Sequence, residues 1–535
     1  MSIPFPAVAL ARLPQLFRGR QRWLGLGLLG LSFIVAGASV YLGSFVDEDA
    51  VLGTAALMAR GQVLYRDVFS HHMPAAYYWV AGALTLLGHT ILAARLSYLF
   101  FTLLTFALLM RFTGAYVTVG LAALAWGAVA HLYGGHMVMY HGFAGVGLML
   151  VFGVALAHCL GALRQPRLAA GVMGVYAAVT LLANPLTVWP LGWVFVVLGA
   201  LWLRRRHTLL AAVAVCAACL GVYLAYLLLS GTFTDFYQEV IQFNRSIYSH
   251  YTNTDPLIYL RSARNVMSRG LDLFRPDLWL APVNVGPVGR FPPLLAWLFS
   301  GFLYRLAVWA LCGLLLARRQ WLPAAFLYVF IGLTLARSNA WFRQPAFVLA
   351  VLVALALVLD HWLRQPPRLT GGQWLRSGAW LATALALSAG LLWPVVAGGV
   401  SLWAYRRELS YAHNFGGAEA RAAEMERLAG GHAARLGYYP GDPLIHMLSG
   451  LPPVAGYLYM FPWVAEVAQA EVIADLAQGP AIVFLQTEAS IWGRPVGQYL
   501  APLQAFLEAN YVQVGPNLYV SPDLYRSESD KRPGP

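Results

Sequence analysis

The chain has 535 residues, of which 59% are hydrophobic and only 11% are charged, and it carries a formal net charge of +13. Almost all of its cationic side chains are arginines, many of them in short segments between apolar runs, where membrane topology accounts for them. The charge therefore does not indicate a nucleic-acid partner, and we expect none. The first apolar run is long enough to span a bilayer, and no small-residue cleavage site follows it, so we expect no cleavable signal peptide.

Hydropathy predicts a polytopic α-helical membrane protein with about eleven transmembrane helices. A further apolar segment, 74–88, is short and follows two histidines and a proline, so we expect it to lie in the membrane interface. The predicted spans are 23–45, 90–112, 114–131, 142–163, 168–183, 186–203, 208–230, 299–317, 321–336, 345–363 and 377–399.

Arginine placement predicts the orientation of these spans. The arginines fall in the N-terminal segment 1–22 and in alternate loops, which the positive-inside rule makes cytoplasmic. The membrane domain 23–399 then carries outer loops at 46–89 and 231–298, and the tail lies outside the cytoplasm. The arginines concerned are Arg12, Arg18, Arg20, Arg22, Arg111, Arg164, Arg167, Arg204, Arg205, Arg206, Arg318, Arg319, Arg364, Arg368 and Arg376.

The C-terminal part changes character after about residue 400. It contains a charged amphipathic stretch, "GGAEARAAEMERLAGG", and two strand-like stretches, "AIVFLQ" and "YVQVGPNLYV". Glycine and proline punctuate these stretches. We therefore expect a small extracytoplasmic α/β domain over 400–525, followed by a disordered tail over 526–535.

One nucleotide-binding pattern, Gly25-x-Gly27-x-x-Gly30, lies within the first span. No strand precedes it, and no acidic residue follows at the distance that a dinucleotide site requires. Small residues that let helices pack closely are the better interpretation.

Three acidic residues, Asp47, Glu48 and Asp49, follow the first span. A structural reading makes Asp47 the N-cap of a helix from Glu48 to Arg60, with Gly61 at its end. That reading does not exclude chemistry, because a carboxylate held at a helix start near the membrane surface suits a general base.

The stretch "DEDAVLGTAALMARGQVLYRDVFSHHMPAAYYWVAGALTLLGHTILAARL" resembles the first outer loop of GT-C fold glycosyltransferases of the protein O-mannosyltransferase and lipid A aminoarabinose transferase family. The resemblance extends over about fifty residues in order and spacing. Elsewhere it is looser, and rests on span count, a long outer loop and an outer C-terminal domain. The matching positions are Asp47-Glu48, Gly61, Tyr65, Asp67, His71 or His72, Pro74, Gly88 and Ala94-Arg95-Leu96.

The resemblance implies an enzyme that moves a sugar from a polyprenyl-phosphate donor to a hydroxyl acceptor outside the cytoplasm, with inversion. Asp47 would be the catalytic base, and Glu48 would support the interfacial helix or contact the donor sugar. Donor or acceptor contacts would further come from Asp67, His71, His72, Tyr140 and His141. No cofactor would be required, and the protein would lie in a bacterial inner membrane, among membrane lipids.

A cationic partner for the leaving phosphate is expected in "LARSNAWFRQPAF", where Arg337 and Arg343 stand against the positive-inside trend. Contact with lipid headgroups is the alternative role for this pair. Weaker candidates are Arg245, Arg261 and Arg264.

Two alternatives remain open. "DED" could be part of a divalent-metal site, with His131, His136 and His141 as further ligands, although their five-residue spacing is not a known ligand pattern. The protein could also be a transporter or flippase of lipid-linked sugars. Spans nearly free of charge and an odd number of spans count against a transporter. The sequence identifies neither the sugar nor the acceptor.

Overall fold

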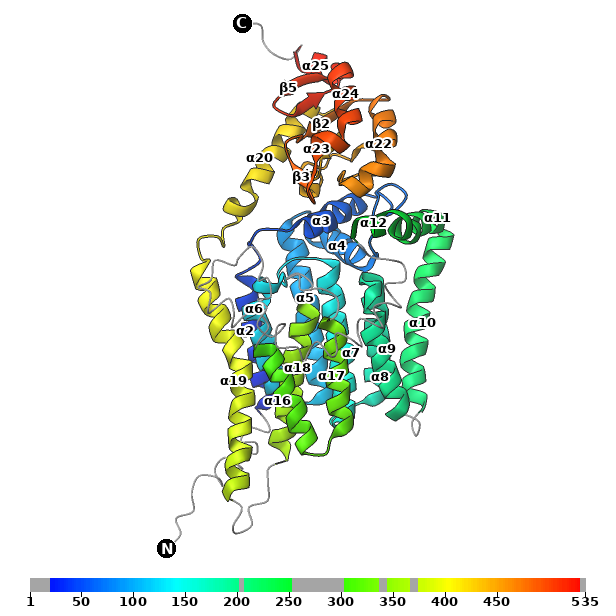
Figure 1. Ribbon diagram of the computed structural model, residues 1–535. Coiled ribbons are helices and arrows are strands. Elements are labelled where there is room, and N and C mark those ends of the chain that lie inside the picture. Colours follow the sequence, from blue (N-terminus) through cyan, green and yellow to red (C-terminus); the bar gives the residue numbers. More distant parts are fainter. Residues whose placement is uncertain (1–19, 202–205, 253–302, 336–343, 366–373, 530–535) are drawn as a thin grey trace.

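The computed structural model describes residues 20–201, 206–252, 303–335, 344–365 and 374–529. It shows a helical bundle with a small α/β domain at one end (Figure 1). Each predicted span has a helix at its position: α2 (Gln21–Gly37), α5 (Ile91–Thr113), α6 (Tyr116–Val129), α7 (Tyr140–Cys159), α8 (Pro166–Ala183), α9 (Val188–Leu201), α10 (Arg206–Leu229), α16 (Leu303–Ala317), α17 (Trp321–Leu335), α18 (Pro345–Arg364) and α19 (Trp374–Ala404). Among the described residues, seven helices are long and apolar enough to cross a membrane. The prediction of a polytopic helical membrane protein is confirmed.

The first span is shorter than predicted. α2 ends at Gly37 rather than near residue 45, and a turn follows it. The hydroxyl of Ser39 donates to the carbonyl of Ala36 in this turn. The carbonyls of Val40 and Leu42 accept hydrogen bonds from Arg95. These carbonyls are therefore satisfied outside a helix, and the chain can leave the bundle early.

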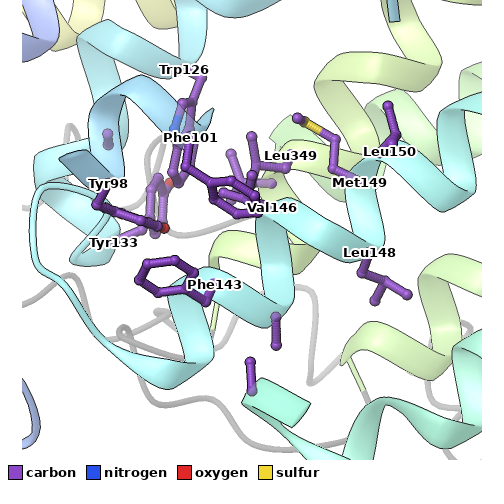
Figure 2. Packing of buried hydrophobic residues seen from close by; sticks show 14 of the residues in the cluster. Tyr98, Phe101, Trp126, Tyr133, Phe143, Val146, Leu148, Met149, Leu150 and Leu349 are labelled. Carbon is purple, nitrogen blue, oxygen red and sulfur yellow. The ribbon is translucent and has the colours of Figure 1, made fainter. Parts of the chain in front are cut away.

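α7 lies at the centre of the bundle, and aromatic rings from α5 and α7 pack together there (Figure 2). The ring centroids of Phe101 and Phe143 are 5.3 Å apart. Glycines let the neighbouring backbones approach: a Cβ on Gly145 would lie 3.0 Å from the Ala346 nitrogen of α18. Small residues thus set the helix spacing, as is common in membrane proteins.

The glycines of the first span behave partly as expected. A Cβ on Gly25 would meet the Tyr116 carbonyl oxygen of α6 at 2.6 Å. Gly27 and Gly30 have open space around the same position. Of the three, Gly25 is the one that helix packing requires.

Among the described residues, several arginines predicted to share one side lie at one end of the bundle, opposite the α/β domain (Figure 1). The Arg22 guanidinium lies over the Tyr116 ring. The backbone N–H of Arg164 donates to the carbonyl of Phe112, and the Arg364 side chain donates to the carbonyl of Thr113. The basic loops therefore converge, as the positive-inside rule requires.

The opposite end carries α3 (Val46–Ala59), α4 (Ala75–Leu87) and a chain of short turns over 233–252. These turns are α11 (Phe233–Phe236), the π-helices η4 (Tyr237–Gln242) and η5 (Asn244–Tyr248), and α12 (Ser249–Thr252). Figure 1 places α3, α4, α11 and α12 between the bundle and the C-terminal domain. Helices are present at both positions where we predicted them, over 74–88 and from Glu48 to Arg60.

The C-terminal domain follows α19. Its four-stranded sheet has the order β1-β2-β6-β5, with β1 parallel to β2 and the other neighbours antiparallel. The strands are β1 (Arg435–Tyr439), β2 (Ala481–Leu485), β5 (Val512–Gly515) and β6 (Leu518–Val520), and a hairpin is formed by β3 (Ser490–Ile491) and β4 (Arg494–Pro495). The helices are α20 (Tyr411–Ala429), α21 (Pro443–Ser449), α22 (Pro462–Leu476), α23 (Val496–Tyr499), α24 (Ala501–Asn510) and α25 (Pro522–Ser529). The predicted strands are confirmed, and α25 includes the first residues of the predicted tail.

The orientation in the cell can be tested with two matched alanines, Ala423 on α20 and Ala317 at the end of α16, both exposed. In a background with the four native cysteines replaced by alanine, Ala423→Cys should react with an impermeant maleimide in intact spheroplasts. Ala317→Cys should react only after permeabilisation, because it lies at the arginine-rich end. Labelling in the opposite order would reverse the orientation of every site described below.

Candidate active site

The helix that carries the acidic residues begins earlier than predicted. Phe45 occupies the N-cap position in an extended conformation, and its carbonyl accepts from the backbone N–H groups of Glu48 and Asp49. Asp47 is therefore the second residue of α3, and the prediction that it caps the helix is wrong. Gly61, with φ +99°, follows the helix end, as expected.

Glu48 is buried and fixed by an ion pair. Arg95 Nε donates to Glu48 Oε1 at 2.9 Å, and an Arg95 terminal nitrogen lies 2.5 Å from Glu48 Oε2. Both side chains have no exposed surface. The backbone N–H of Val138 also donates to Glu48 Oε1. With its oxygens held in this way, Glu48 acts on the fold rather than facing an open site.

Asp49 faces the C-terminal domain. Its Oδ1 is buried and accepts no hydrogen bond among the described residues. Burial, and then the nearby charge of Asp442, raise the pKa of Asp49 well above its usual value. This carboxyl therefore favours its protonated, neutral form.

Asp47 is half-buried, and its Oδ2 accepts a hydrogen bond from the Tyr140 hydroxyl at 3.2 Å. Two buried tyrosines lie close enough to feel the charge of Asp47. Burial is the main cause that raises the pKa of Tyr77 and of Tyr459, and the negative charge of Asp47 raises both further. The three consecutive carboxyl groups thus have three different environments, and that of Asp47 is a cluster of tyrosines.

Aromatic side chains continue from Asp47 on both sides of Tyr140. The His72 ring stacks on the Tyr140 ring, with centroids 4.2 Å apart and planes at 25°. The His141 ring also lies 4.2 Å from Tyr140, and its Nδ1 is 2.8 Å from the side-chain nitrogen of Asn184. The structure therefore brings Asp47, His72, Tyr140 and His141 together, which sequence reasoning had selected separately.

His71 turns the other way, into a buried aromatic pocket. Its Nδ1 lies 3.2 Å from the Tyr459 hydroxyl, and its ring is 4.8 Å from the Tyr248 ring. The side-chain nitrogen of Asn244 donates to the His71 carbonyl. Burial, and then the neighbouring His72, lower the pKa of His71 well below its usual value, so this ring is neutral.

Asp67 organises a turn. Its Oδ2 accepts from the Val63 backbone N–H at 2.7 Å, and Arg66 pairs with it at 3.1 Å. Burial alone would raise the pKa of Asp67, but the hydrogen bonds from Arg66 and Val63 outweigh it, and the pKa is lowered. In the same turn, Tyr65 has φ +73°, and its hydroxyl donates to the His72 carbonyl. Asp67 thus contributes to the site by shaping the loop that presents His72.

Glu239 was not singled out from the sequence, where it is an ordinary acidic residue in "DFYQEVIQF". Its Oε2 accepts from the Ser70 backbone N–H at 2.8 Å. Burial raises the pKa of Glu239 to about 9. The hydroxyl of Ser70 donates to the Tyr77 hydroxyl and lies 3.3 Å from the His72 nitrogen. Glu239, from the predicted outer loop 231–298, therefore fixes the loop that carries His71 and His72.

A small cleft opens beside His141, between α7, α9 and the ends of α17 and α18. Polar groups reach it from Asn184, Thr187 and Thr334, and Ala346 lines it from the first turn of α18. The predicted phosphate ligands Arg337 and Arg343 lie outside the described residues, as do Arg261 and Arg264. Arg245 is described, on η5.

The three histidines considered as metal ligands have separate neighbours. His131 Nε2 lies 2.7 Å from the Ser401 hydroxyl, and His136 Nε2 lies 3.4 Å from the Gly43 carbonyl. His141 contacts Asn184. Among the described residues, no three His, Cys, Asp or Glu side chains gather in a group that could hold a metal ion.

The arrangement of bundle, interfacial helices and C-terminal domain is that of the GT-C membrane fold. The chain is similar to ArnT of Cupriavidus metallidurans in the apo state, with a TM-score of 0.52 and 15% identity over 92% of this chain and 96% of that one. ArnT bound to undecaprenyl phosphate gives a TM-score of 0.50 and 15% identity over 93% and 97%. An oligosaccharyltransferase of Archaeoglobus fulgidus gives 0.45 and 13% over 86% and 69%. No family model and no curated protein matches the sequence.

The Glu48–Arg95 pair makes a prediction for stability. Glu48→Gln should leave the Arg95 charge buried without its partner, at a cost of about 3–5 kcal/mol, and should lower the unfolding temperature in detergent. The double variant Glu48→Gln, Arg95→Gln should lose less than the two single variants together, because no charge remains unpaired. Arg66→Ala, which removes an exposed ion pair, should change little. Unchanged unfolding of Glu48→Gln would contradict this role.

Proposed function

We propose that this protein is an inverting glycosyltransferase that moves a sugar from a polyprenyl-phosphate-linked donor to a hydroxyl acceptor at the outer membrane face. The acceptor is a protein, a lipid or a cell-envelope glycan. One observation carries the proposal: of the three carboxyl groups at the start of α3, Glu48 is ion-paired and the pKa of Asp49 is raised by burial, whereas Asp47 accepts a hydrogen bond from the Tyr140 hydroxyl. Asp47 is thus the carboxylate suited to take a proton.

In this mechanism, the oxygen of the acceptor hydroxyl attacks the anomeric carbon of the donor sugar, and Asp47 accepts the proton of that hydroxyl. The bond from that carbon to the phosphate oxygen breaks, the lipid phosphate leaves, and the configuration inverts. The Tyr140 hydroxyl, which donates to Asp47 Oδ2, orients the base. His72 and His141 flank this point and would contact the sugars, whereas Glu48 and Asp67 position the elements that carry the site.

The fold supports a lipid-phosphate donor by analogy, because one of the similar structures is ArnT bound to undecaprenyl phosphate. We place Arg343, with Arg337 as the second candidate, at the donor phosphate. A bacterial inner membrane, with the site on its outer face, is the location that fits the arginine distribution.

The base can be tested with two adjacent isosteric substitutions. Asp47→Asn removes the proton acceptor, and the transfer rate at saturating donor should fall about 10²- to 10⁴-fold while the protein remains folded. Asp49→Asn is the matched control, because Asn resembles the neutral form that Asp49 already favours. Near wild-type turnover by a folded Asp47→Asn protein would reject the catalytic role and, with it, the proposed reaction.

The leaving-group site is tested at Arg343. Arg343→Ala should weaken donor binding by removing a charge-assisted hydrogen bond to phosphate, worth about 1.5–3 kcal/mol. Arg343→Lys should recover only part of this, because an ammonium lacks the planar fork of a guanidinium. The measurement is donor affinity in titrations of purified protein. If both variants bind donor normally, Arg337 or Arg245 becomes the candidate.

A further inference from the structure

The C-terminal domain presents an exposed tryptophan at the tip of the β3–β4 hairpin. The Trp492 side chain is 60% exposed, and its ring packs against the ring of Trp463, with centroids 4.5 Å apart. Tyr251 of α12 lies on another side of Trp463, at 5.9 Å. Residues from three separate segments thus form one aromatic cluster, in which Trp492 is exposed and Trp463 is buried beneath it. We call this cluster the tryptophan platform: Tyr248, Tyr251, Phe461, Trp463 and Trp492.

The backbone at this tip is unusual for a tryptophan. Trp492 and Gly493 are the two turn residues of the hairpin, with φ +51° and +77°. Turns with two positive φ angles favour Asn-Gly or Gly-Gly, and a bulky residue in this conformation is a strained outlier. Backbone strain at a residue whose side chain is exposed is more typical of a binding site than of a packing requirement.

Hydrogen-bonding groups border the platform. The Arg494 guanidinium lies 4.6 Å above the Tyr251 ring, and it donates to the Tyr251 hydroxyl at 3.4 Å. The same hydroxyl donates to Glu466 at 2.8 Å. An exposed ring such as that of Trp492, beside a guanidinium and a carboxylate, can recognise a carbohydrate, because the C–H face of a sugar stacks on the ring while its hydroxyls bind the charged groups.

The platform is continuous with the base. From Trp463, ring contacts lead to Tyr248 at 5.4 Å, to His71 at 4.8 Å and to His72 at 4.0 Å. His72 stacks on Tyr140, whose hydroxyl donates to Asp47. A series of adjoining aromatic rings therefore connects the exposed tip of the C-terminal domain to the carboxylate that would activate the acceptor.

We infer that the tryptophan platform binds a glycan, as the part of the acceptor that extends outside the membrane from the reacting hydroxyl. This inference rests on the proposed function, because the glycan is taken to extend from the hydroxyl at Asp47 to the platform. Insertion of Trp492 into the membrane interface, where tryptophan is enriched, is the alternative that the experiment below distinguishes. The connection to Asp47 favours a substrate over a lipid surface.

The experiment uses full-length protein in nanodiscs without donor, titrated with two soluble linear glycans, cellohexaose and chitohexaose, by saturation-transfer NMR. The wild type should bind at least one of them, and Trp492→Asn should weaken that binding about tenfold. Asn suits the left-handed turn position, so this variant should keep the hairpin and the unfolding temperature. Trp321→Asn, at an exposed tryptophan on α17 at the opposite end of the bundle, should bind as the wild type does.

Two further arms separate the outcomes. Glycan binding should persist in Asp47→Asn. Normal sugar transfer by that variant would contradict the proposed chemistry, whereas loss of glycan binding in Trp492→Asn tests the platform separately. In nanodiscs with brominated lipids, Trp492→Asn should leave the quenching of tryptophan fluorescence unchanged. Absence of binding to both glycans, equal binding by Trp492→Asn, or loss of lipid quenching in that variant would each overturn the inference, the last in favour of a membrane anchor.

Discussion

The guanidinium of Arg95 connects four segments that are distant in the sequence. Its donors bind Glu48 of α3 and the carbonyls of Val40 and Leu42 after α2, while Glu48 also accepts from Val138 before α7. The guanidinium also lies over the ring of Phe415 in α20. A buried ion pair is costly to desolvate and stabilises little unless its remaining hydrogen-bonding groups are satisfied. Here they are satisfied by backbone, so the pair fixes where α3 starts relative to α7 and therefore where Asp47 meets Tyr140.

This constraint explains how three consecutive acidic residues can serve different purposes. Successive residues on a helix point about 100° apart, so residues 47, 48 and 49 must face different surroundings once one of them is fixed. With Glu48 directed at Arg95, Asp49 lies near Asp442 of the C-terminal domain, and Asp47 faces Tyr140 at the start of α7. Desolvation then raises the pKa of Asp49, whose Oδ1 is buried, whereas Asp47 accepts a hydrogen bond from the Tyr140 hydroxyl.

Some of this was predictable from the sequence, for identifiable reasons. Span positions follow from hydropathy, which is a local property, and the strands of the C-terminal domain follow from short apolar runs between turns. The start of α3 was not predictable, because Phe45 occupies the N-cap position, which Asp or Ser usually occupies. Glu48 and Arg95 were both noticed, but nothing in the sequence pairs residues 47 positions apart. Glu239 and Trp492 acquire meaning only through contacts with Ser70 and Trp463, from other segments.

The contacts at the base of the C-terminal domain bear on what this domain does. A Cβ on Gly53 of α3 would lie 2.5 Å from the carbonyl oxygen of Pro443, so helix and domain are in direct backbone contact. Arg60 donates to two carbonyls in the last turn of α21, those of His446 and Met447, and the His446 carbonyl also accepts from the backbone N–H of Gly450. Tyr459 reaches His71 from the same domain. Since removal of the domain would expose the apolar face of α3 and uncover His71, the domain is part of the wall of the candidate site, and the fold of the acidic segment depends on it.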